Sequence, residues 1–272
     1  MRSNASEFYM EPFRVVGNLY FVGTRPASAH LIDTGDGLIL LDVGYQQTLY
    51  LVIHSICRMG FRIGDIRLIL LSHGHIDHLG GAKNLAALSG AKIAIGAQDA
   101  DYANGRRDLT YARELGMIYD TPFQPDILLR DGDTLEIGRT KIRCFHTPGH
   151  TEGTMSYLFN VIDGAREWTA GTHGGIGINT MSRAFLNEYN LPLRLRDAFR
   201  NGLDRMRDQH VDVLVPNHQD QWDTIGRYQR LLAGDESAFI DDTAWPGYLD
   251  MAEARLNALL EDEEKCDTIE SR

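Results

Sequence analysis

The sequence predicts an α/β protein in which two β-sheets pack face to face and helices cover the outer faces. Three observations lead to this prediction. The first forty residues contain short apolar stretches separated by glycine and Asp-Gly turns, a pattern typical of antiparallel strands. Strands followed by helices come next, and the second half of the chain repeats this order. With 43% hydrophobic and 24% charged residues, the 272-residue chain has the composition of a globular protein and is long enough to bury a core.

The pattern of apolar residues places the elements of the first half. Strands are expected at residues 13–17, 19–23, 28–34 and 37–44. A helix is expected from Gln46 to Met59, because apolar residues recur there at helical spacing and Gly60 can end it. The largely apolar run at residues 66–72 is typical of a strand covered on both faces. Residues 81–88 predict the next helix.

The second half opens with a strand at residues 91–97 and a polar insert at about residues 98–124. Further strands are expected at residues 133–138, 140–147, 154–161, 166–171 and 211–217. Helices are expected from Arg194 to Asp208 and, at the C-terminus, over residues 247–265. The chain contains no low-complexity linker, so we expect one domain over residues 1–272, with residues 1–12 flexible.

Charge and hydropathy narrow the range of partners. A formal net charge of −11 disfavours nucleic acids and anionic membranes, which are bound through clustered Lys and Arg. No apolar run approaches the ~20 residues that a membrane span requires. We therefore expect a small-molecule substrate, and the oligomeric state stays open. No secretory leader is visible, which predicts a cytoplasmic protein, or a periplasmic or secreted one if a leader has been removed.

The cysteines do not predict a metal site. Cys57, Cys144 and Cys266 lie far apart and form no CxxC pair. Cys57 falls in a helical pattern and Cys144 in a strand pattern, so both are expected to be small buried side chains. Cys266 lies in a charged tail and is expected to be free.

The stretch SHGHIDHLGG, residues 72–81, predicts a metal site instead. His73, His75, Asp77 and His78 fall within six residues, directly after a strand that is expected to be buried. Imidazole nitrogens and carboxylates are good zinc ligands. Four such groups are too many for one tetrahedral site that must also keep a position open for substrate. The cluster therefore predicts two adjacent metals, with further ligands from elsewhere in the chain.

Two other histidines are candidates to complete the ligand sets. His150 follows a Pro-Gly turn after the strand at 140–147, and His218 follows the strand at 211–217. Both lie where a strand gives way to a loop, and sites commonly gather ligands from such loops. His173, in the stretch GTHGG, is a candidate to contact metal or substrate. The remaining histidines at 30, 54 and 210 are expected to be structural, and His146 lies nearer the candidate site.

The motifs HGHIDH, TPGHT and PNH, in this order and spacing, resemble those of the metallo-β-lactamase superfamily. The resemblance runs from about residue 13 to residue 260 and implies an αββα sandwich of two mixed β-sheets, with the metals at one edge. Gly171-Thr172 stands where relatives carry a bridging acid or a cysteine, so the chain is most similar to the third subclass of zinc β-lactamases. That likeness implies two ligand sets: His73, His75 and His150 for one zinc, and Asp77, His78 and His218 for the other.

The resemblance also implies a function. It predicts a zinc-dependent hydrolase, with two zincs per chain, that uses a metal-bound hydroxide to open a cyclic amide; a β-lactamase acting in antibiotic resistance is favoured. A lactonase or thioester hydrolase is the alternative, and an iron-dependent redox relative is less favoured. Asp77 and His150 are expected to be catalytic, and Asp42 to fix the ligands through hydrogen bonds. The residues expected to contact substrate are Thr172, His173, Gly175, Gly177 and Asn179. Gly175 and Gly177 stand where the subclass often has serines.

Overall fold

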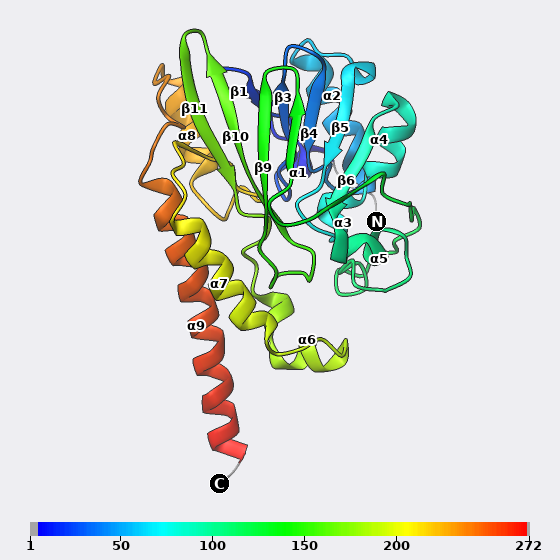
Figure 1. The fold of residues 1–272 in the computed structure, drawn as a ribbon, viewed down its shortest axis with the longest axis vertical. Coiled ribbons are helices and arrows are strands. Elements are labelled where there is room, and N and C mark those ends of the chain that lie inside the picture. Colours follow the sequence, from blue (N-terminus) through cyan, green and yellow to red (C-terminus); the bar gives the residue numbers. More distant parts are fainter. Residues whose placement is uncertain (1–4, 271–272) are drawn as a thin grey trace.

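Two mixed β-sheets lie face to face in the computed structural model, which describes residues 5–270 (Figure 1). The first sheet runs in chain order: β1 (Phe13–Val16), β2 (Leu19–Phe21), β3 (His30–Asp33), β4 (Leu38–Leu41), β5 (Ile66–Leu70), β6 (Lys92–Gly96) and β7 (Ile127–Leu129). The second has the order β12 (Val213–Leu214), β11 (Arg166–Thr172), β10 (Met155–Asp163), β9 (Thr140–His146) and β8 (Thr134–Ile137). Neighbours from β4 to β7 are parallel, as are β11 and β12, and the other neighbours are antiparallel.

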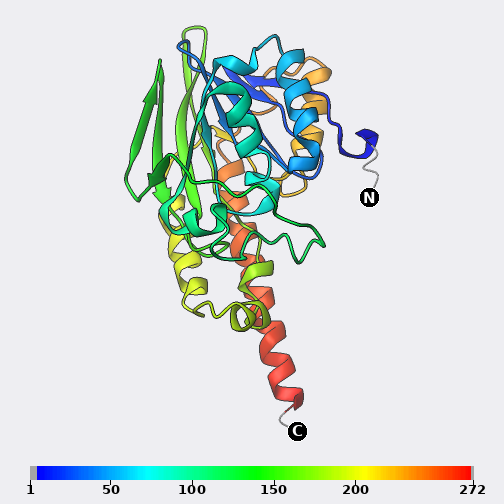
Figure 2. The same ribbon diagram turned by 90° about the vertical axis from the view of Figure 1, so that its right-hand side faces the viewer.

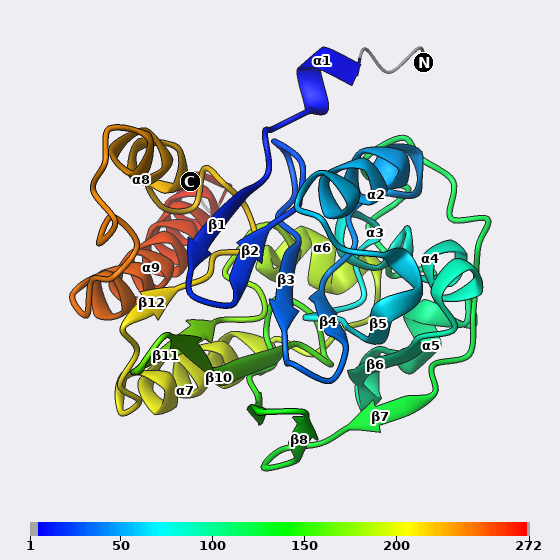
Figure 3. The same ribbon diagram turned by 90° about the horizontal axis from the view of Figure 1, so that it is seen from above.

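Helices cover the outer faces of both sheets (Figure 3). The helices of the described residues are α1 (Ala5–Phe8), which projects away from the sandwich, α2 (Leu49–Arg58), α3 (Ile76–Leu79), α4 (Ala82–Ser89), α5 (Ala100–Ala103), α6 (Arg183–Glu188), α7 (Leu195–Arg207), α8 (Thr224–Leu232) and α9 (Ala244–Glu270). Helices α2 and α4 pack on the first sheet, and α7 and α9 pack on the second. The predicted αββα sandwich is therefore confirmed. Within the described residues, no helix is both long and apolar enough to cross a membrane.

Strand β4 consists only of apolar residues, because both of its faces are buried. Its side chains alternate between two hydrophobic layers, because successive residues of a strand point to opposite faces. Ile39 and Leu41 belong to the core between the sheets. Leu38 and Leu40 belong to the layer under α2 and α4. Each fully buried aliphatic side chain of this kind contributes about 1.5–3 kcal/mol relative to exposure.

Three local predictions differ from the structure. Helix α9 exceeds the predicted range of 247–265 at both ends; Pro246 lies in its first turn, where a missing N–H costs nothing, and its far end extends beyond the sandwich (Figure 2). Cys57 is exposed, because the apolar face of α2 is formed by other residues. The insert at 98–124 is less polar than expected, since it buries Tyr102 and Leu109.

The ends of the chain leave one prediction untested. Within the segment predicted to be flexible, residues 5–8 form α1 and Tyr9 makes a β-bridge with Thr24. Residues 1–4 lie outside the described part. Flexibility of residues 1–12 therefore stays a prediction.

The topology brings the candidate ligands to one edge of the sandwich. Asp42 directly follows β4, and His73 comes shortly after β5, its parallel neighbour. From the second sheet, His150 follows β9 and His218 follows β12. Because strand ends from both sheets meet here, residues up to 176 positions apart in the sequence can surround one site.

Candidate metal centre

Three buried histidines form the first group of ligands. Nitrogen atoms of His73, His75 and His150 all lie within 4.8 Å of one another. Their ring centroids are separated by 4.5–4.7 Å, and the rings are nearly perpendicular. Two of these residues come from the loop after β5 and one from the loop after β9, as the sequence predicted.

The hydrogen bonds of this group orient its lone pairs toward a common point. The hydroxyl of Ser72 donates to Asp42 at 2.7 Å, so it must accept from His73 Nδ1 at 3.0 Å. This leaves His73 Nε2 as an acceptor, and among the described residues it has no hydrogen-bond partner although it is buried. His150 Nδ1 likewise donates to the carbonyl of Gly177 at 2.8 Å. A buried nitrogen without a donor is costly unless a cation binds it.

Asp77, His78 and His218 form the second group. Their facing atoms are separated by 3.2 Å between the two Nε2 atoms, 3.3 Å from His78 Nε2 to Asp77 Oδ2, and 3.5 Å from His218 Nε2 to the same oxygen. Zinc with ligands at about 2.0–2.1 Å in a tetrahedron requires ligand separations of about 3.3–3.4 Å. The group therefore has the dimensions of a zinc site.

The outer nitrogens of these two histidines are also fixed. His78 Nδ1 donates to Asp42 at 2.9 Å and His218 Nδ1 to the Pro26 carbonyl at 2.6 Å. Both Nε2 atoms then direct lone pairs at each other. This arrangement is unfavourable unless a cation or a proton binds between them. A looser grouping within 4.8 Å joins Asp77 and His78 to His73 instead. His218 is the candidate third ligand of this group, because its Nε2 lies 3.2 Å from His78 Nε2 and 3.5 Å from Asp77 Oδ2.

The electrostatics of the site suit neutral imidazole ligands. Burial, reinforced by neighbouring imidazoles, holds the pKa of His73 and His75 well below the usual range, and burial lowers the pKa of His150 to about 4. Burial also opposes charge on His78, but the carboxylates of Asp77 and Asp42 outweigh it and raise its pKa to about 10. Burial opposes charge on Asp77 too, yet His78 and His218 hold its pKa well below the usual range. A metal ion would replace the proton on His78.

Asp42 makes the hydrogen bonds that a residue supporting the candidate ligands would make. It is buried, and its carboxylate accepts from the backbone N–H and the hydroxyl of Ser72, both at 2.7 Å, as well as from His78. Its backbone is left-handed, with φ of 56°, which is uncommon for residues other than glycine but tolerated by Asp. One carboxylate therefore orients ligands of both groups.

Asp99 is a buried residue beside the ligand loops that was not predicted from the sequence. Its fully buried carboxylate accepts from Gly74 N at 2.8 Å, from Gly153 N at 2.7 Å and from the Thr151 hydroxyl at 2.6 Å. Burial raises its pKa to about 6, although these hydrogen bonds counteract the shift. The signal available in the sequence was an aspartate shortly after an apolar strand, the same signal that identified Asp42.

A pocket of about 250 Å³ opens onto both groups. His75, Asp77, His150 and His218 form part of its lining. The rest of the wall is Tyr45, Tyr111, Leu115, Gly177, Asn179, Asp220, Gln221 and Arg255. A substrate in this pocket would lie directly against the ligand groups.

The family follows from this match of motif, fold and site. Residues 22–161, about half of the chain, match the family model described as the metallo-beta-lactamase superfamily. The chain belongs to the metallo-β-lactamase superfamily. Its His-rich site makes it a metallo-hydrolase of that superfamily, with two candidate metal sites consistent with binuclear zinc.

Solved metallo-β-lactamases share the whole architecture. The native FEZ-1 metallo-β-lactamase of Legionella gormanii superposes with a TM-score of 0.85 and 27% identity, over 94% of this chain and 97% of that one. The Rm3 metallo-β-lactamase gives a TM-score of 0.84 and 28% identity, over 95% and 96%. BJP-1, a subclass B3 enzyme of Bradyrhizobium japonicum, has the same fold, with a TM-score of 0.86 over 98% and 99% at 23% identity.

Curated relatives match over a shorter stretch. The hydroxyacylglutathione hydrolase of Acidiphilium cryptum is 38% identical over 96 residues, which cover 35% of this chain and 32% of that protein. That of Francisella tularensis subsp. novicida is 33% identical over 96 residues, covering 35% and 30%. The chain thus spans about a third of the length of these curated relatives.

The substrate contacts predicted for this superfamily member need correction. Gly177 and Asn179 do line the pocket. Thr172 and His173, at and just beyond the end of β11, are buried and do not belong to its lining. The ring of His173 packs 5.9 Å from that of Phe199.

Gly175 is also buried rather than open to substrate. A Cβ atom there would lie 2.4 Å from Cδ2 of His150, far inside van der Waals contact. At Gly177 it would lie 2.9 Å from Cε1 of the same ring. Glycine is therefore required at these positions by the approach of the backbone to His150, and a serine cannot simply replace it.

The remaining histidines lie outside both ligand groups, as expected. His30 is buried against Phe21, and His54 is exposed on α2. His146 Nε2 donates to the carbonyl of Glu152 at 2.8 Å. His210 pairs with Asp212 at the surface. None of these contacts calls for a metal.

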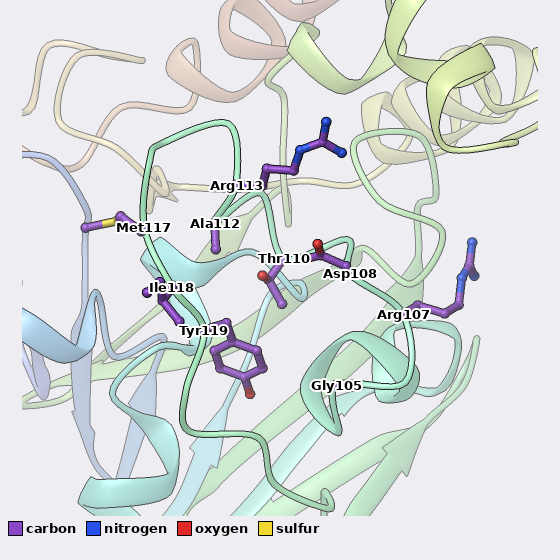
Figure 4. A pocket seen from close by; sticks show the side chains of 9 residues that line it. All are labelled: Gly105, Arg107, Asp108, Thr110, Ala112, Arg113, Met117, Ile118 and Tyr119. Carbon is purple, nitrogen blue, oxygen red and sulfur yellow. The ribbon is translucent and has the colours of Figure 1, made fainter.

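The insert carries a second pocket, of about 340 Å³ (Figure 4). Arg107 and Arg113 line it, but their guanidinium groups point away from the other side chains (Figure 4) and pair with Glu152 and Glu188. The carbonyl of Thr110 accepts from Ile76 N at 2.8 Å. The insert is thereby fastened to the loop that carries His75 and Asp77.

Proposed function

We propose that this metallo-hydrolase is a di-zinc β-lactamase that opens the cyclic amide of a substrate carrying a carboxylate. One observation carries the proposal: a three-histidine group and an Asp-His-His group lie side by side at the base of a single pocket. Support comes from β-lactamases that share the fold over nearly the whole chain at 27–28% identity.

Different residues of the chain would bind the metals, orient the water and orient the ligands. His73, His75 and His150 would hold one zinc, and Asp77, His78 and His218 the other. Bound zinc would supply Lewis acidity for the substrate carbonyl and for a water molecule. Asp77 stays ionised, so its carboxylate can accept a hydrogen bond from the attacking water and orient it. Gly177 and Asp42 hold His150 and His78 in the required orientation.

Arg255 gives the pocket wall one cation that could bind an anionic substrate, beside the acidic lining residues Asp77 and Asp220. Arg255, from α9, lines the pocket and forms no ion pair with any residue that the structure describes. Beside it, the Gln221 carbonyl oxygen accepts from the Tyr248 hydroxyl at 2.8 Å, which leaves the Gln221 amide hydrogens to donate. In a chain of net charge −11, a pocket cation is the group that would attract a carboxylate.

A thioester hydrolase is the second candidate. It is favoured by the sequence similarity to hydroxyacylglutathione hydrolases around the shared motif. Glutathione thioesters also carry carboxylates, so Arg255 is compatible with both candidates. A neutral homoserine lactone would leave the guanidinium without a partner.

The test is a direct comparison of substrates. Protein shown by elemental analysis to hold two zinc equivalents is assayed with a chromogenic cephalosporin, a glutathione thioester and an acyl-homoserine lactone. The proposal requires the cephalosporin to have the highest kcat/KM. Faster turnover of the thioester would replace it with the second candidate, and faster turnover of the lactone would contradict both.

Arg255→Gln should raise KM for the cephalosporin about ten- to a hundred-fold, the value of a lost hydrogen bond to a charged group. Arg200→Gln, which removes an exposed charge from α7, is the matched control.

A further inference from the structure

One buried carboxylate joins the two loops that carry the three-histidine group. Asp99 ends the 3₁₀ turn Ala97–Asp99 after β6. Its Oδ2 accepts from Gly74 N and from the Thr151 hydroxyl, and its Oδ1 accepts from Gly153 N. All three hydrogen bonds are 2.6–2.8 Å long, and Asp99 is 0% exposed.

The positions of these donors decide what the carboxylate does. Gly74 lies between His73 and His75, whereas Thr151 directly follows His150. The two loops come from different sheets, so no backbone ladder fixes the distance between them at this point. Outside the Asp99 contacts, the first loop is tied to the second sheet by Met155 N donating to Ser72 O at 2.9 Å and by the Tyr157 hydroxyl donating to Leu71 O at 2.7 Å, both ahead of His73. Asp99 is therefore the side chain placed to set the separation of His150 from the other two histidines.

The glycines beside Asp99 show how closely the loops are drawn onto it. A Cβ on Gly153 would lie 2.6 Å from Asp99 Oδ1 and 2.4 Å from Asp99 N. A Cβ on Gly74 would lie 3.2 Å from Asp99 Cβ. A buried carboxylate is costly unless its oxygens are satisfied, and here three donors satisfy it. Such a complete arrangement tolerates little movement of either loop.

We propose that Asp99 is a positioning residue for the three-histidine site, acting through Gly74 and Thr151 without contacting metal or substrate. The inference rests on the metal centre of the proposed function, but not on the identity of the substrate. Asp99 would hold the ligands at the separation that one zinc requires. Its loss should therefore weaken that zinc selectively.

The test measures metal affinity rather than turnover. In Asp99→Asn one carboxylate oxygen becomes an NH2 group that cannot accept, so at least one of the three donors loses its partner while side-chain size is kept. Zinc affinity is determined by competition with a chelator in a His218→Ala background, where the three-histidine site is studied by itself. The expected loss is about ten- to a hundred-fold, as for other residues that support metal ligands. Asp126→Asn is the control, because its carboxylate accepts from Ile93 N at 2.8 Å away from the site.

A second variant keeps the proposal falsifiable if Asp99→Asn does not fold. Thr151→Val removes only the hydroxyl that donates to Asp99 Oδ2 and should weaken the same zinc by about three- to ten-fold. In the double variant the two losses should be less than additive, because both act through one hydrogen bond. Unchanged affinity in Thr151→Val, or in a folded Asp99→Asn, would overturn the proposal. If His218→Ala alone binds no zinc, the metal centre itself is wrongly assigned. If zinc binds as expected but no β-lactam is opened, the proposed function fails and this inference stands.

Discussion

His78 Nδ1 donates to the carboxylate of Asp42 at 2.9 Å, and the same carboxylate oxygen accepts from the Ser72 hydroxyl that orients His73. A single side chain thus fixes one imidazole in each ligand group.

We predict that Asp42→Asn lowers the affinity for both zincs by about ten- to a hundred-fold, because its amide would face the N–H of His78. Chelator competition monitored by metal analysis measures this. Asp33→Asn, at the end of the neighbouring strand β3, should bind zinc like wild type. Loss at one site alone would contradict the shared role.

Removal of His218 should separate the two sites. His218→Ala leaves Asp77 and His78 as ligands of the second zinc, and two protein ligands seldom hold zinc tightly. The three-histidine group is untouched, so metal content should fall from about two equivalents to about one. The fold should survive, since His218 is partly exposed and lies in a loop.

His150→Ala is the reciprocal variant, and it should deplete the first site and lose more activity. Both variants are compared at matched free zinc by metal analysis and kcat. Two tightly held zincs in His218→Ala would show that this residue is not a ligand.

Gly175→Ser is expected to damage the metal site rather than improve substrate binding. The new Cβ would press on the His150 ring, which must then move away from His73 and His75. Zinc affinity at the first site and kcat/KM should each fall by about tenfold or more. Gly64→Ser is the control, because a Cβ there meets nothing within 4 Å. A lower KM for cephalosporins at unchanged metal affinity would refute this expectation.

The candidate ligands could be picked out from the sequence because they are marked locally. Four of them fall within six residues, and His150 and His218 each follow an apolar strand. The αββα arrangement followed from the order of strands and helices. These features depend on periodicity and on residue type, both of which are visible along the chain.

Features that depend on distant contacts could not be predicted in the same way. The donors to Asp99 lie 25, 52 and 54 positions away, and nothing in the sequence near Asp99 indicates them. The role of Gly175 depends on how closely the loop after β11 approaches His150. Thr172 and His173 lie only a few positions before Gly177, which lines the pocket, but both are buried. Arg255 enters the pocket only because α9 packs across the second sheet.

Tyr111 combines backbone strain with a place on the pocket wall. Its φ is 61°, a region that costs a bulky residue about 1–2 kcal/mol, and its ring lies 5.4 Å from that of His75. Tyr111→Gly should leave the melting temperature unchanged or slightly higher while kcat/KM falls about tenfold, because a substrate loses an aromatic contact. Asn190→Gly, which relieves a φ of 52° away from the pocket, should change neither quantity appreciably. Equal kcat/KM in Tyr111→Gly and wild type would remove Tyr111 from the substrate site.

His30 should make stability depend on pH independently of catalysis. Burial lowers its pKa to about 4, although the nearby Asp42 carboxylate counteracts the shift. In the unfolded chain its pKa is about 6.5, so between pH 6.5 and 4 the unfolded state binds more protons than the folded state. The free energy of unfolding must therefore fall as the pH drops through this window. At about 1.4 kcal/mol per pKa unit, the full contribution is about 3 kcal/mol.

His30→Phe tests this contribution, because phenylalanine can pack against Phe21 but cannot take up a proton. Urea unfolding of chelator-treated wild type and variant is compared from pH 7.5 to pH 4. Other buried histidines titrate in both proteins, so their effects cancel in the difference. As the pH falls, the free energy of unfolding of the variant should rise by about 3 kcal/mol relative to that of wild type. His54→Phe, which removes an exposed imidazole from α2, should follow the wild-type curve. Parallel curves for wild type and His30→Phe would show that His30 takes up its proton at the same pH in the folded and unfolded states, and hence that the Asp42 carboxylate offsets the effect of burial on its pKa.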